Sequence, residues 1–243
     1  MISFEGRHIL VIGGGSGIGL AATALLTGMG AKLAVADRDE DSAGRLPENA
    51  SFHPCDATDP ASVSAMIGSA EGALGTIDGL FITIGGAALG PLADMDLAAW
   101  NREIRFNLDS IYICCQAALP ALARGGGGAI VTTSSGYAIM AGTDRAAYTA
   151  AKAGVIAFSR SLAAIAAPQR TRVNCIAPGP TDTPRFRAMN GGDDGVEKVR
   201  QSMPLGSIPT PEDCAKLAVF LLSEAASQIT GQTIHVNGGL LMP

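Results

Sequence analysis

Short apolar runs alternate along this chain with longer segments in which apolar residues recur at helical spacing. The runs predict seven β-strands, at residues 8–12, 32–37, 50–56, 79–84, 128–134, 171–178 and 232–239. None of the runs alternates cleanly between apolar and polar positions, which is typical of parallel strands that are covered on both faces. We therefore expect a buried sheet.

The segments between these runs predict helices, and two of them have clear start signals. The expected helices lie at 17–30, 60–75, 96–123, 144–167 and 210–224, and the third is long enough to be kinked. Asp59 is placed to cap the second helix, with Pro60 at its first position, and Thr210 opens the last one. Regular alternation of strands and helices predicts an α/β fold with a doubly wound parallel β-sheet of the Rossmann type, flanked by helices on both faces.

No internal repeat or linker divides the chain, so residues 1–243 are expected to form a single dinucleotide-binding and catalytic domain. The least regular stretch is 184–209, which contains three prolines and the pair Gly191–Gly192. Long irregular insertions in such folds are often lids. We expect a mobile substrate-binding loop here, with one or two short helices.

The composition of the chain argues against several classes of binding partner. The net charge is −5, and no basic stretch is dense enough to follow a phosphate backbone, which argues against nucleic-acid binding. We find no signal peptide and no apolar stretch of membrane-spanning length, so a membrane partner is not expected. The 5 cysteines form no C-x-x-C pair, which argues against a disulfide framework or a metal site and favours a reducing, cytoplasmic compartment.

A glycine-rich loop follows the first predicted strand and opens the first predicted helix. In this position GGGSGIG (13–19) allows a tight turn and lets a pyrophosphate approach the backbone N–H groups at a helix N-terminus. A glycine-rich turn without a ligand is the alternative. The candidate cofactor-binding residues are Gly13, Gly15, Ser16, Gly17 and Ile18.

The residues that end the second predicted strand bear on which dinucleotide would bind. Asp37 is placed to accept hydrogen bonds from the adenine ribose hydroxyls, and its charge would repel a 2′-phosphate. Arg38 follows directly and could instead receive that phosphate. The pair favours NAD over NADP.

Tyr148 and Lys152 stand one helical turn apart in AAYTAAKAG (146–154), a segment of small residues. Free tyrosine is a weak acid, with a pKa of about 10. A positive charge one turn away would lower that pKa and make Tyr148 a usable proton donor. Ser135, at the end of the fifth predicted strand, could hydrogen-bond a substrate oxygen. Asn107, inside a helical region, is either a catalytic residue or a structural one at a kink or buried water.

Together these motifs resemble the short-chain dehydrogenases/reductases, in their short single-domain branch, over residues 6–240. GGGSGIG matches the glycine motif of that family, and CDATD (55–59) resembles its adenine-contacting segment. PGPTDT (178–183) matches the segment that lies against the nicotinamide, and Gly85 ends the loop after the fourth strand. The resemblance implies catalytic roles for Asn107, Ser135, Tyr148 and Lys152. It implies cofactor contacts for Asp56, Ala57, Gly85, Tyr148, Lys152, Pro178, Gly179, Thr181 and Thr183.

The chain also departs from the family pattern. Ile12 replaces the threonine that normally opens the glycine motif, and Asn237 replaces an aspartate in the C-terminal motif. The asparagine-containing segment after the fourth strand is here Ile82, Thr83 and Ile84. These changes affect details of cofactor binding rather than the type of reaction.

The resemblance implies hydride transfer between a nicotinamide and a secondary alcohol or ketone. In this mechanism Tyr148 exchanges the proton, Ser135 orients the substrate oxygen, Lys152 lowers the tyrosine pKa and holds the nicotinamide ribose, and Asn107 positions a relaying water. A 3-oxoacyl-thioester reductase and a non-catalytic NAD(P)-binding sensor are the alternatives. A serine hydrolase is disfavoured because no G-x-S-x-G motif surrounds Ser135. The resemblance also implies a homotetramer, or a homodimer, with small-molecule substrates.

The expected walls of the substrate pocket are 86–91, 136–143 and the loop after Thr183. They offer mostly apolar side chains: Tyr137, Ile139, Met140, Phe186 and Met189. Arg185 and Arg187 either meet an anionic group of the substrate or are solvated loop charges.

Overall fold

The computed structural model describes residues 2–242, which fold around one seven-stranded sheet in the order β3-β2-β1-β4-β5-β6-β7. Each pair of neighbouring strands is parallel. The strands are β1 (His8–Ile12), β2 (Lys32–Asp37), β3 (Ala50–Pro54), β4 (Gly79–Ile82), β5 (Gly128–Thr133), β6 (Thr171–Pro178) and β7 (Thr233–Val236). The predicted doubly wound Rossmann-type sheet is confirmed. The strand order reverses between β1 and β4, and in such sheets ligands bind outside the carboxyl ends of the strands at that point.

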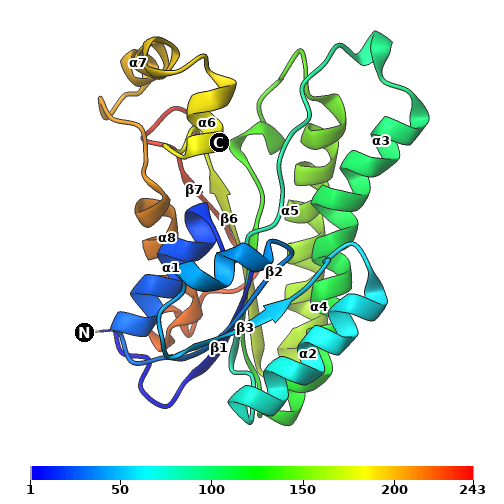
Figure 1. Ribbon diagram of the computed structural model, residues 1–243, viewed down its shortest axis with the longest axis vertical. Coiled ribbons are helices and arrows are strands. Elements are labelled where there is room, and N and C mark those ends of the chain that lie inside the picture. The colour runs from blue at the N-terminus through cyan, green and yellow to red at the C-terminus, as the bar shows by residue number, and fades with distance from the viewer. Residues whose placement is uncertain (1, 243) are drawn as a thin grey trace.

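Helices cover both faces of the sheet (Figure 1). They are α1 (Gly17–Gly28), α2 (Pro60–Leu74), α3 (Leu97–Ile104), α4 (Ser110–Arg124), α5 (Ala146–Ala166), α6 (Pro184–Met189), α7 (Asp193–Ser202) and α8 (Pro211–Leu222). Short 3-10 turns occupy Glu40–Arg45, Leu92–Asp94, Gly136–Ala138, Ala167–Gln169 and Glu224–Ala226. Helices α1 and α8 pack together on one face, whereas α2, α4 and α5 lie on the other.

Strand β1 shows why the sequence lacks polar alternation. Ile9 and Val11 belong to the core under α1 and α8, and Leu10 and Ile12 belong to the core under α2, α4 and α5. All four side chains are at most 1% exposed. Both faces of the strand are therefore selected for apolar side chains, which stabilise the sheet by about 25 cal/mol per Å² of apolar surface buried.

Four strands end earlier than the sequence predicted. β3, β4, β5 and β7 stop at Pro54, Ile82, Thr133 and Val236, and the residues after them turn into loops above the sheet. The sequence pattern continues past the last paired residue of these strands, so the pattern alone does not mark where pairing stops. Residues that follow β3, β4 and β5 line the two cavities described below.

The predicted N-terminal capping residues of two helices are confirmed. Asp59 accepts hydrogen bonds from the N–H groups of Ala61 and Ser62, and Thr210 and Asp213 form a reciprocal capping box at the start of α8. The expected long helix is broken into α3, a π-helical turn at Arg105–Asp109, and α4. Asn107 lies within this π-helical turn, and such turns are frequent at functional sites.

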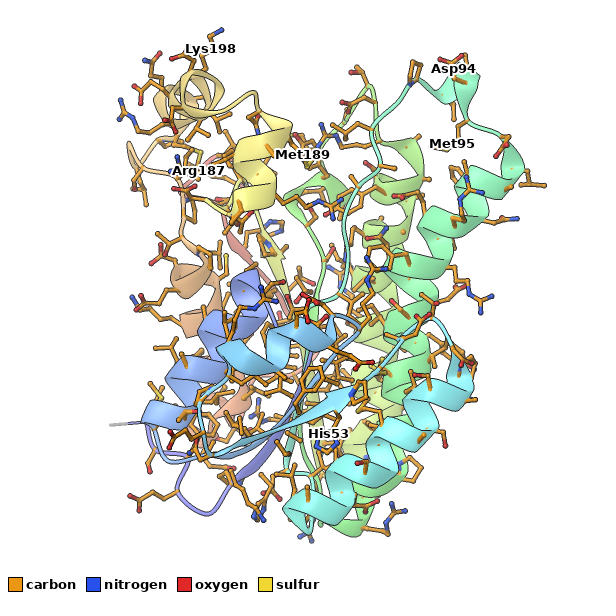
Figure 2. All side chains as sticks on the ribbon, viewed as in Figure 1. His53, Asp94, Met95, Arg187, Met189 and Lys198 are labelled. Carbon is orange, nitrogen blue, oxygen red and sulfur yellow. The ribbon has the colours of Figure 1, made fainter. Side chains whose placement is uncertain are left out.

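The segment 184–209 contains two short helices, α6 and α7, as expected, and they stand above the carboxyl edge of the sheet (Figure 1). Arg187 and Met189 project from opposite sides of α6 (Figure 2). Met189 lines the cavity, and Arg187 forms ion pairs with Asp182 and Asp193. This helix therefore presents one side to the cavity and the other to the surface.

The sequence predicted no apolar stretch of membrane-spanning length, and this prediction was wrong. Ala146–Gln169 is long and apolar enough to cross a membrane by length and composition alone. The same stretch packs against β6 and contributes Val155, Leu162 and Ala163 to the core on one face of the sheet. The alanine-rich sequence of this helix gives it a high mean hydropathy, although only 39% of the apolar window is buried within the protein.

Candidate active site

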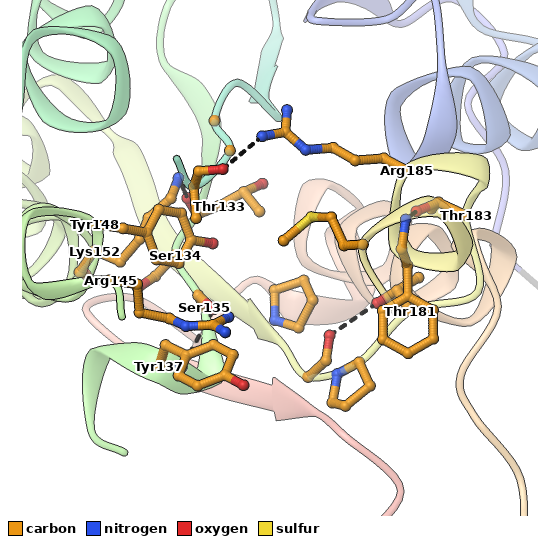
Figure 3. A pocket seen from close by; sticks show the side chains of 18 of the residues that line it. Thr133, Ser134, Ser135, Tyr137, Arg145, Tyr148, Lys152, Thr181, Thr183 and Arg185 are labelled. Carbon is orange, nitrogen blue, oxygen red and sulfur yellow. Dashed lines mark hydrogen bonds between the residues drawn. The ribbon is translucent and has the colours of Figure 1, made fainter. Parts of the chain in front are cut away.

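A cavity of about 550 Å³ opens at the carboxyl ends of the strands, between α6 and the wall formed by α5 and the loop after β4 (Figure 3). A volume in this range suits a small organic ligand. A second, smaller cavity of about 140 Å³ adjoins the glycine loop and the end of β2. Thr83, Ile84 and Gly85 line both cavities, so the two are neighbouring parts of one cleft.

Lys152 lies on α5, lines the larger cavity and is only 2% exposed. Its ammonium donates to the carbonyls of Ile84 and Thr133, at 3.1 and 3.0 Å. Burial lowers the pKa of Lys152 from 10.5 to about 8. The two carbonyls fix the ammonium between the carboxyl ends of β4 and β5, in the wall of the cavity.

Tyr148 lies one turn before Lys152 and lines the same cavity (Figure 3). The Lys152 ammonium is 5.9 Å from the centroid of the tyrosine ring. Burial raises the pKa of Tyr148, and the Ser135 hydroxyl and the charges of Arg145 and Arg185 offset this only in part. The sequence predicted a lowered pKa caused by Lys152. That expectation was wrong for this structure because desolvation of the phenol is the largest effect.

Ser135 directly follows β5 in extended backbone geometry and also lines the cavity. Its hydroxyl accepts a hydrogen bond from the Tyr137 N–H at 3.2 Å. The neighbouring Ser134 hydroxyl donates to the Lys152 carbonyl at 2.7 Å and ties the end of β5 to α5. The serine and the tyrosine are thus held by two elements that are bonded to each other, which preserves their relative position.

Asn107 is fully buried behind the cavity wall and does not line the cavity. Its amide accepts from the Gly86 N–H and donates to the Gly86 carbonyl, at 2.9 and 3.0 Å. The side chain therefore clamps the loop after β4 in both directions. The sequence left open a structural role for Asn107 at a kink or a buried water. The structure shows a clamp that holds Gly85 and Gly86 in place, and the catalytic role stays a prediction.

Gly85 has a conformation and surroundings that exclude any side chain. Its φ is +146°, and an added Cβ would lie 2.5 Å from the Lys152 ammonium and 2.8 Å from Asn107 Oδ1. The loop backbone can approach Lys152 and Asn107 only because residue 85 has no Cβ.

The glycine loop is built to receive an anion. Gly13 and Gly17 have φ of +81° and +50°, and a Cβ at Gly19 would lie 2.1 Å from the Gly13 carbonyl oxygen. Ser16 precedes α1 without a side-chain capping bond, and the first turn holds no acidic residue. The first N–H groups of α1 are thus left for a ligand, and the positive end of the helix dipole favours a phosphate there.

The residues after β2 and β3 form the smaller cavity. Asp37 Oδ2 accepts from the Gly15 N–H at 3.0 Å, so this carboxylate also holds the glycine loop. Arg38 lies over the ring of Phe106, 5.6 Å from its centroid. Hydrogen bonds from the N–H and hydroxyl of Thr58 lower the pKa of Asp56, which keeps this carboxyl ionised. These residues fit the adenosine part of a dinucleotide.

Most predicted site residues are brought together around this cleft. The larger cavity is lined by Ile18, Gly85, Ser135, Tyr148, Lys152, Pro178, Gly179, Thr181 and Thr183. The smaller one is lined by Gly13, Ser16, Asp37, Arg38, Asp56, Ala57 and Gly85. Gly15, Gly17 and Asn107 line neither cavity. Gly15 and Asn107 act through the hydrogen bonds described above.

Some cavity residues were missed or misplaced by sequence reasoning. Arg145 lines the cavity, with its guanidinium 4.1 Å from the centroid of the Tyr137 ring and ion-paired to Asp144. Its place three residues before Tyr148, at the start of the same helix, was the available signal. Ile139 was expected in the wall, but it is 50% exposed and lies outside the lining.

The departures from the family pattern are accommodated by packing. Ile82 is buried in the core and Ile84 packs against it, while Thr83 bonds the Ile12 carbonyl through its backbone N–H at 2.9 Å. Asn237 donates to the Leu241 carbonyl and accepts from the Gly239 N–H, both at 2.9 Å. Apolar contacts and a backbone hydrogen bond therefore hold the segment after β4, and the Asn237 amide holds the C-terminal loop.

Comparisons with known proteins agree with this architecture. The family described as enoyl-(acyl carrier protein) reductase matches residues 13–241. The chain is 34% identical over 245 residues to a 3-oxoacyl-[acyl-carrier-protein] reductase of Salmonella typhimurium, covering 99% of this chain and 100% of that protein. It is 35% identical over 244 residues to a cis-4-hydroxycyclohexanecarboxylate dehydrogenase of Sinomonas cyclohexanicum, covering 98% and 97%.

A solved structure shows the same fold with a cofactor. A 7α-hydroxysteroid dehydrogenase in complex with NADH and 7-oxo glycochenodeoxycholic acid superposes with a TM-score of 0.93 at 30% identity, covering 98% of this chain and 95% of that one. The fold and the cleft define a nicotinamide-dependent oxidoreductase that acts on CH–OH groups. The chain belongs to the short-chain dehydrogenase/reductase family, in its single-domain form.

Proposed function

We propose that this protein is an NAD-dependent dehydrogenase that interconverts a cyclic or aliphatic secondary alcohol and its ketone, with Tyr148 as the acid/base. The observation that carries this proposal is the shared cavity wall formed by Ser135, Tyr148 and the buried Lys152. The wall faces a cleft that continues to the glycine loop. A binding module would have no use for a serine and a tyrosine placed together over a buried ammonium.

The proton path follows from the positions of these side chains. In the reduction direction the Tyr148 hydroxyl donates its proton to the carbonyl oxygen, and in oxidation the phenolate takes it back. Ser135 holds the same oxygen by a hydrogen bond. The nicotinamide, when bound, supplies or accepts the hydride. Burial raises the pKa of Tyr148 in the protein alone, whereas the Ser135 hydroxyl and the charges of Arg145 and Arg185 act in the opposite direction and favour the phenolate.

We propose that the cofactor is NAD and that Asp37 selects it. The carboxylate stands at the cavity beside the glycine loop, where it would accept ribose hydroxyls and repel a 2′-phosphate. Arg38 is the competing feature, but it lies over Phe106. The remaining proposed cofactor contacts are Gly13, Gly15, Ser16, Gly17, Ile18, Asp56, Ala57, Gly85, Tyr148, Lys152, Pro178, Gly179, Thr181 and Thr183.

A substrate screen that follows NADH absorbance tests both parts of the proposal. Cyclic and aliphatic ketones are offered with NADH and, in parallel, with NADPH, and the corresponding secondary alcohols with NAD and NADP. We expect turnover of at least one ketone–alcohol pair, with a higher kcat/KM for the non-phosphorylated cofactor. Binding of NADH without turnover of any pair would favour the sensor alternative.

A 3-oxoacyl-thioester reductase is the second candidate, because the Salmonella relative carries that activity in its name. Acetoacetyl-CoA with NADPH and with NADH discriminates between the two. A kcat/KM for the thioester above that of every simple ketone would favour this candidate.

We further propose that residues 1–243 form one domain in which 184–209 binds substrate, and that the protein works in the cytoplasm as a homotetramer, or a homodimer. Tyr112 on α4 and Ile165 on α5 are 46% and 62% exposed, which suits helix pairing between subunits. The five cysteines are free and buried, as in proteins of reducing compartments. Light scattering coupled to size exclusion measures the oligomeric state directly.

A further inference from the structure

We infer that the substrate of the proposed dehydrogenase carries a carboxylate, and that Arg185 binds this group at the mouth of the catalytic cavity. The inference rests on the proposed function, since it names the class of ketone or alcohol that the same cavity accepts. It singles out hydroxy and oxo carboxylic acids.

The first observation is the charge of the cavity wall. The chain has a net charge of −5, yet the lining of the larger cavity contains Arg145, Lys152 and Arg185 and no aspartate or glutamate. A cavity lined by one sign of charge attracts ligands of the opposite sign. The cavity lining therefore carries positive charge in a chain whose net charge is negative.

The second observation is that these three cations are not equivalent. Arg145 is neutralised by Asp144, with an Nε–Oδ1 distance of 2.7 Å. The Lys152 ammonium is buried and donates to two carbonyls. Arg185 has no carboxylate partner among residues 2–242, and its one hydrogen bond within the protein is to the Ala87 carbonyl, at 2.9 Å. Its remaining guanidinium N–H groups are available to a ligand.

The two arginines of α6 show that this arrangement is specific to Arg185. Arg187, two residues on, makes paired hydrogen bonds to Asp182, at 2.6 and 2.7 Å, and another to Asp193, at 2.7 Å. It is absent from the cavity lining. Of the two arginines that the sequence left open as anion contacts or solvated charges, only Arg185 reaches the cavity.

The third observation is that the position of the Arg185 guanidinium is defined. The side chain extends from α6 towards the wall that carries Tyr148 (Figure 3), and a Cβ added to Gly86 would lie 2.3–2.6 Å from its guanidinium atoms. Gly86 itself is clamped by Asn107 through two hydrogen bonds. The guanidinium therefore rests against a fixed backbone, and its unused donors are open to a ligand in the cavity.

The remaining large side chains of the cavity lining are mostly apolar. Tyr137, Met140, Phe186, Met189 and Leu240 are cavity-lining side chains with large apolar parts. A ligand that matches all three regions has its carbinol or carbonyl at Tyr148 and Ser135, an apolar body, and a carboxylate at Arg185. A guanidinium–carboxylate pair with two parallel hydrogen bonds fixes orientation as well as affinity.

The test compares kcat/KM for a keto acid, 4-oxocyclohexanecarboxylate, with kcat/KM for its uncharged methyl ester, each reduced with NADH. We expect wild-type kcat/KM to favour the acid by about 10–100-fold, the range for charge-assisted hydrogen bonds. Arg185→Gln should bring the acid-to-ester ratio close to one and leave the Kd for NADH within about twofold. Because the charge of Arg185 also lowers the pKa of Tyr148, the ester is the reference for any general loss of turnover. Arg185→Lys, which keeps the charge and loses the fork geometry, should give an intermediate ratio.

Two further variants control the interpretation. Arg200→Gln removes an arginine on α7 that is bonded to Glu197 and lies outside the cavity lining, and it should keep the wild-type ratio. Gly86→Ala moves the Arg185 guanidinium without removing it and should lower the ratio. Non-reactive cyclohexanecarboxylate, titrated by calorimetry, should bind at least about tenfold more weakly to Arg185→Gln than to wild type, whereas cyclohexanecarboxamide should bind both equally.

The outcomes separate this inference from the proposed reaction. Turnover of the ester without preference for the acid would overturn the inference and leave the dehydrogenase intact. A ratio that persists in Arg185→Gln would also overturn it, as would a weakened Kd for NADH, which would assign Arg185 to the cofactor. No turnover of any ketone or alcohol, in this experiment and in the screen above, would refute the proposed reaction and the inference with it.

Discussion

Gly85 is the residue whose replacement tests the packing of the site most sharply. A Cβ at this position would lie 2.5 Å from the Lys152 ammonium and 2.8 Å from Asn107 Oδ1, at a φ of +146°. The strained backbone of Gly85→Ala costs about 1–3 kcal/mol. Displacing the ammonium from one of its two carbonyl partners costs about 1.5–3 kcal/mol more.

The expected loss in the free energy of unfolding is therefore about 2.5–6 kcal/mol. For a protein of this size it should lower Tm by at least about 5 °C. Because Lys152 must move, kcat/KM should also fall, by at least about tenfold. Thermal melts followed by circular dichroism and steady-state NADH assays measure the two effects.

The matched control is Gly90→Ala, in the same loop. An added Cβ at Gly90 meets nothing within 4 Å, and its φ is not positive. This variant should keep both Tm and kcat/KM close to wild type. Equal Tm and equal kcat/KM for the two variants would refute the close approach of the Gly85 backbone to Lys152.

Three other predictions follow from single side chains. Asp37→Asn should lower the ratio of kcat/KM for NAD to that for NADP by at least about tenfold, because a carboxylate acceptor is worth more than a neutral one; an unchanged ratio in initial-rate assays would show that Asp37 does not select the cofactor. Burial lowers the pKa of Lys152 to about 8, so the unfolded chain holds this proton more tightly. The free energy of unfolding of wild type should therefore rise relative to that of Lys152→Met between pH 8 and about 10.5, by up to about 1.4 kcal/mol per pH unit. Urea titrations at several pH values measure this difference, and a difference that does not change with pH would contradict the prediction. Asp59→Ala removes the acceptor for two N–H groups at the start of α2 and should lower Tm by about 2–4 °C in a thermal melt, whereas an unchanged Tm would show that the cap contributes nothing.

The fold could be predicted because its determinants are local. Both neighbours of Leu10 along β1 point into one apolar core and Leu10 into the other, so the run HILVI carries the signature of a buried strand without any knowledge of its partners. Helix starts at Asp59 and Thr210 were equally visible, since capping needs only residues that are close in sequence.

The candidate site could be predicted only in part, because some of its properties depend on tertiary contacts. Tyr148, Ser135 and the glycine loop belong to motifs with fixed spacing. The raised pKa of Tyr148 results from burial, which spacing does not report. The difference between Arg185 and Arg187 depends on Asp182, on Asp193 and on a loop far away in the sequence.

The central claim is that Tyr148 transfers the proton that accompanies hydride transfer. Its most direct test is the single-turnover rate of NADH oxidation by Tyr148→Phe with the best ketone of the screen, together with the Kd for NADH. We predict a rate at least about 100-fold below wild type, as for loss of a general acid, and a Kd within about threefold. A rate close to wild type would contradict the account.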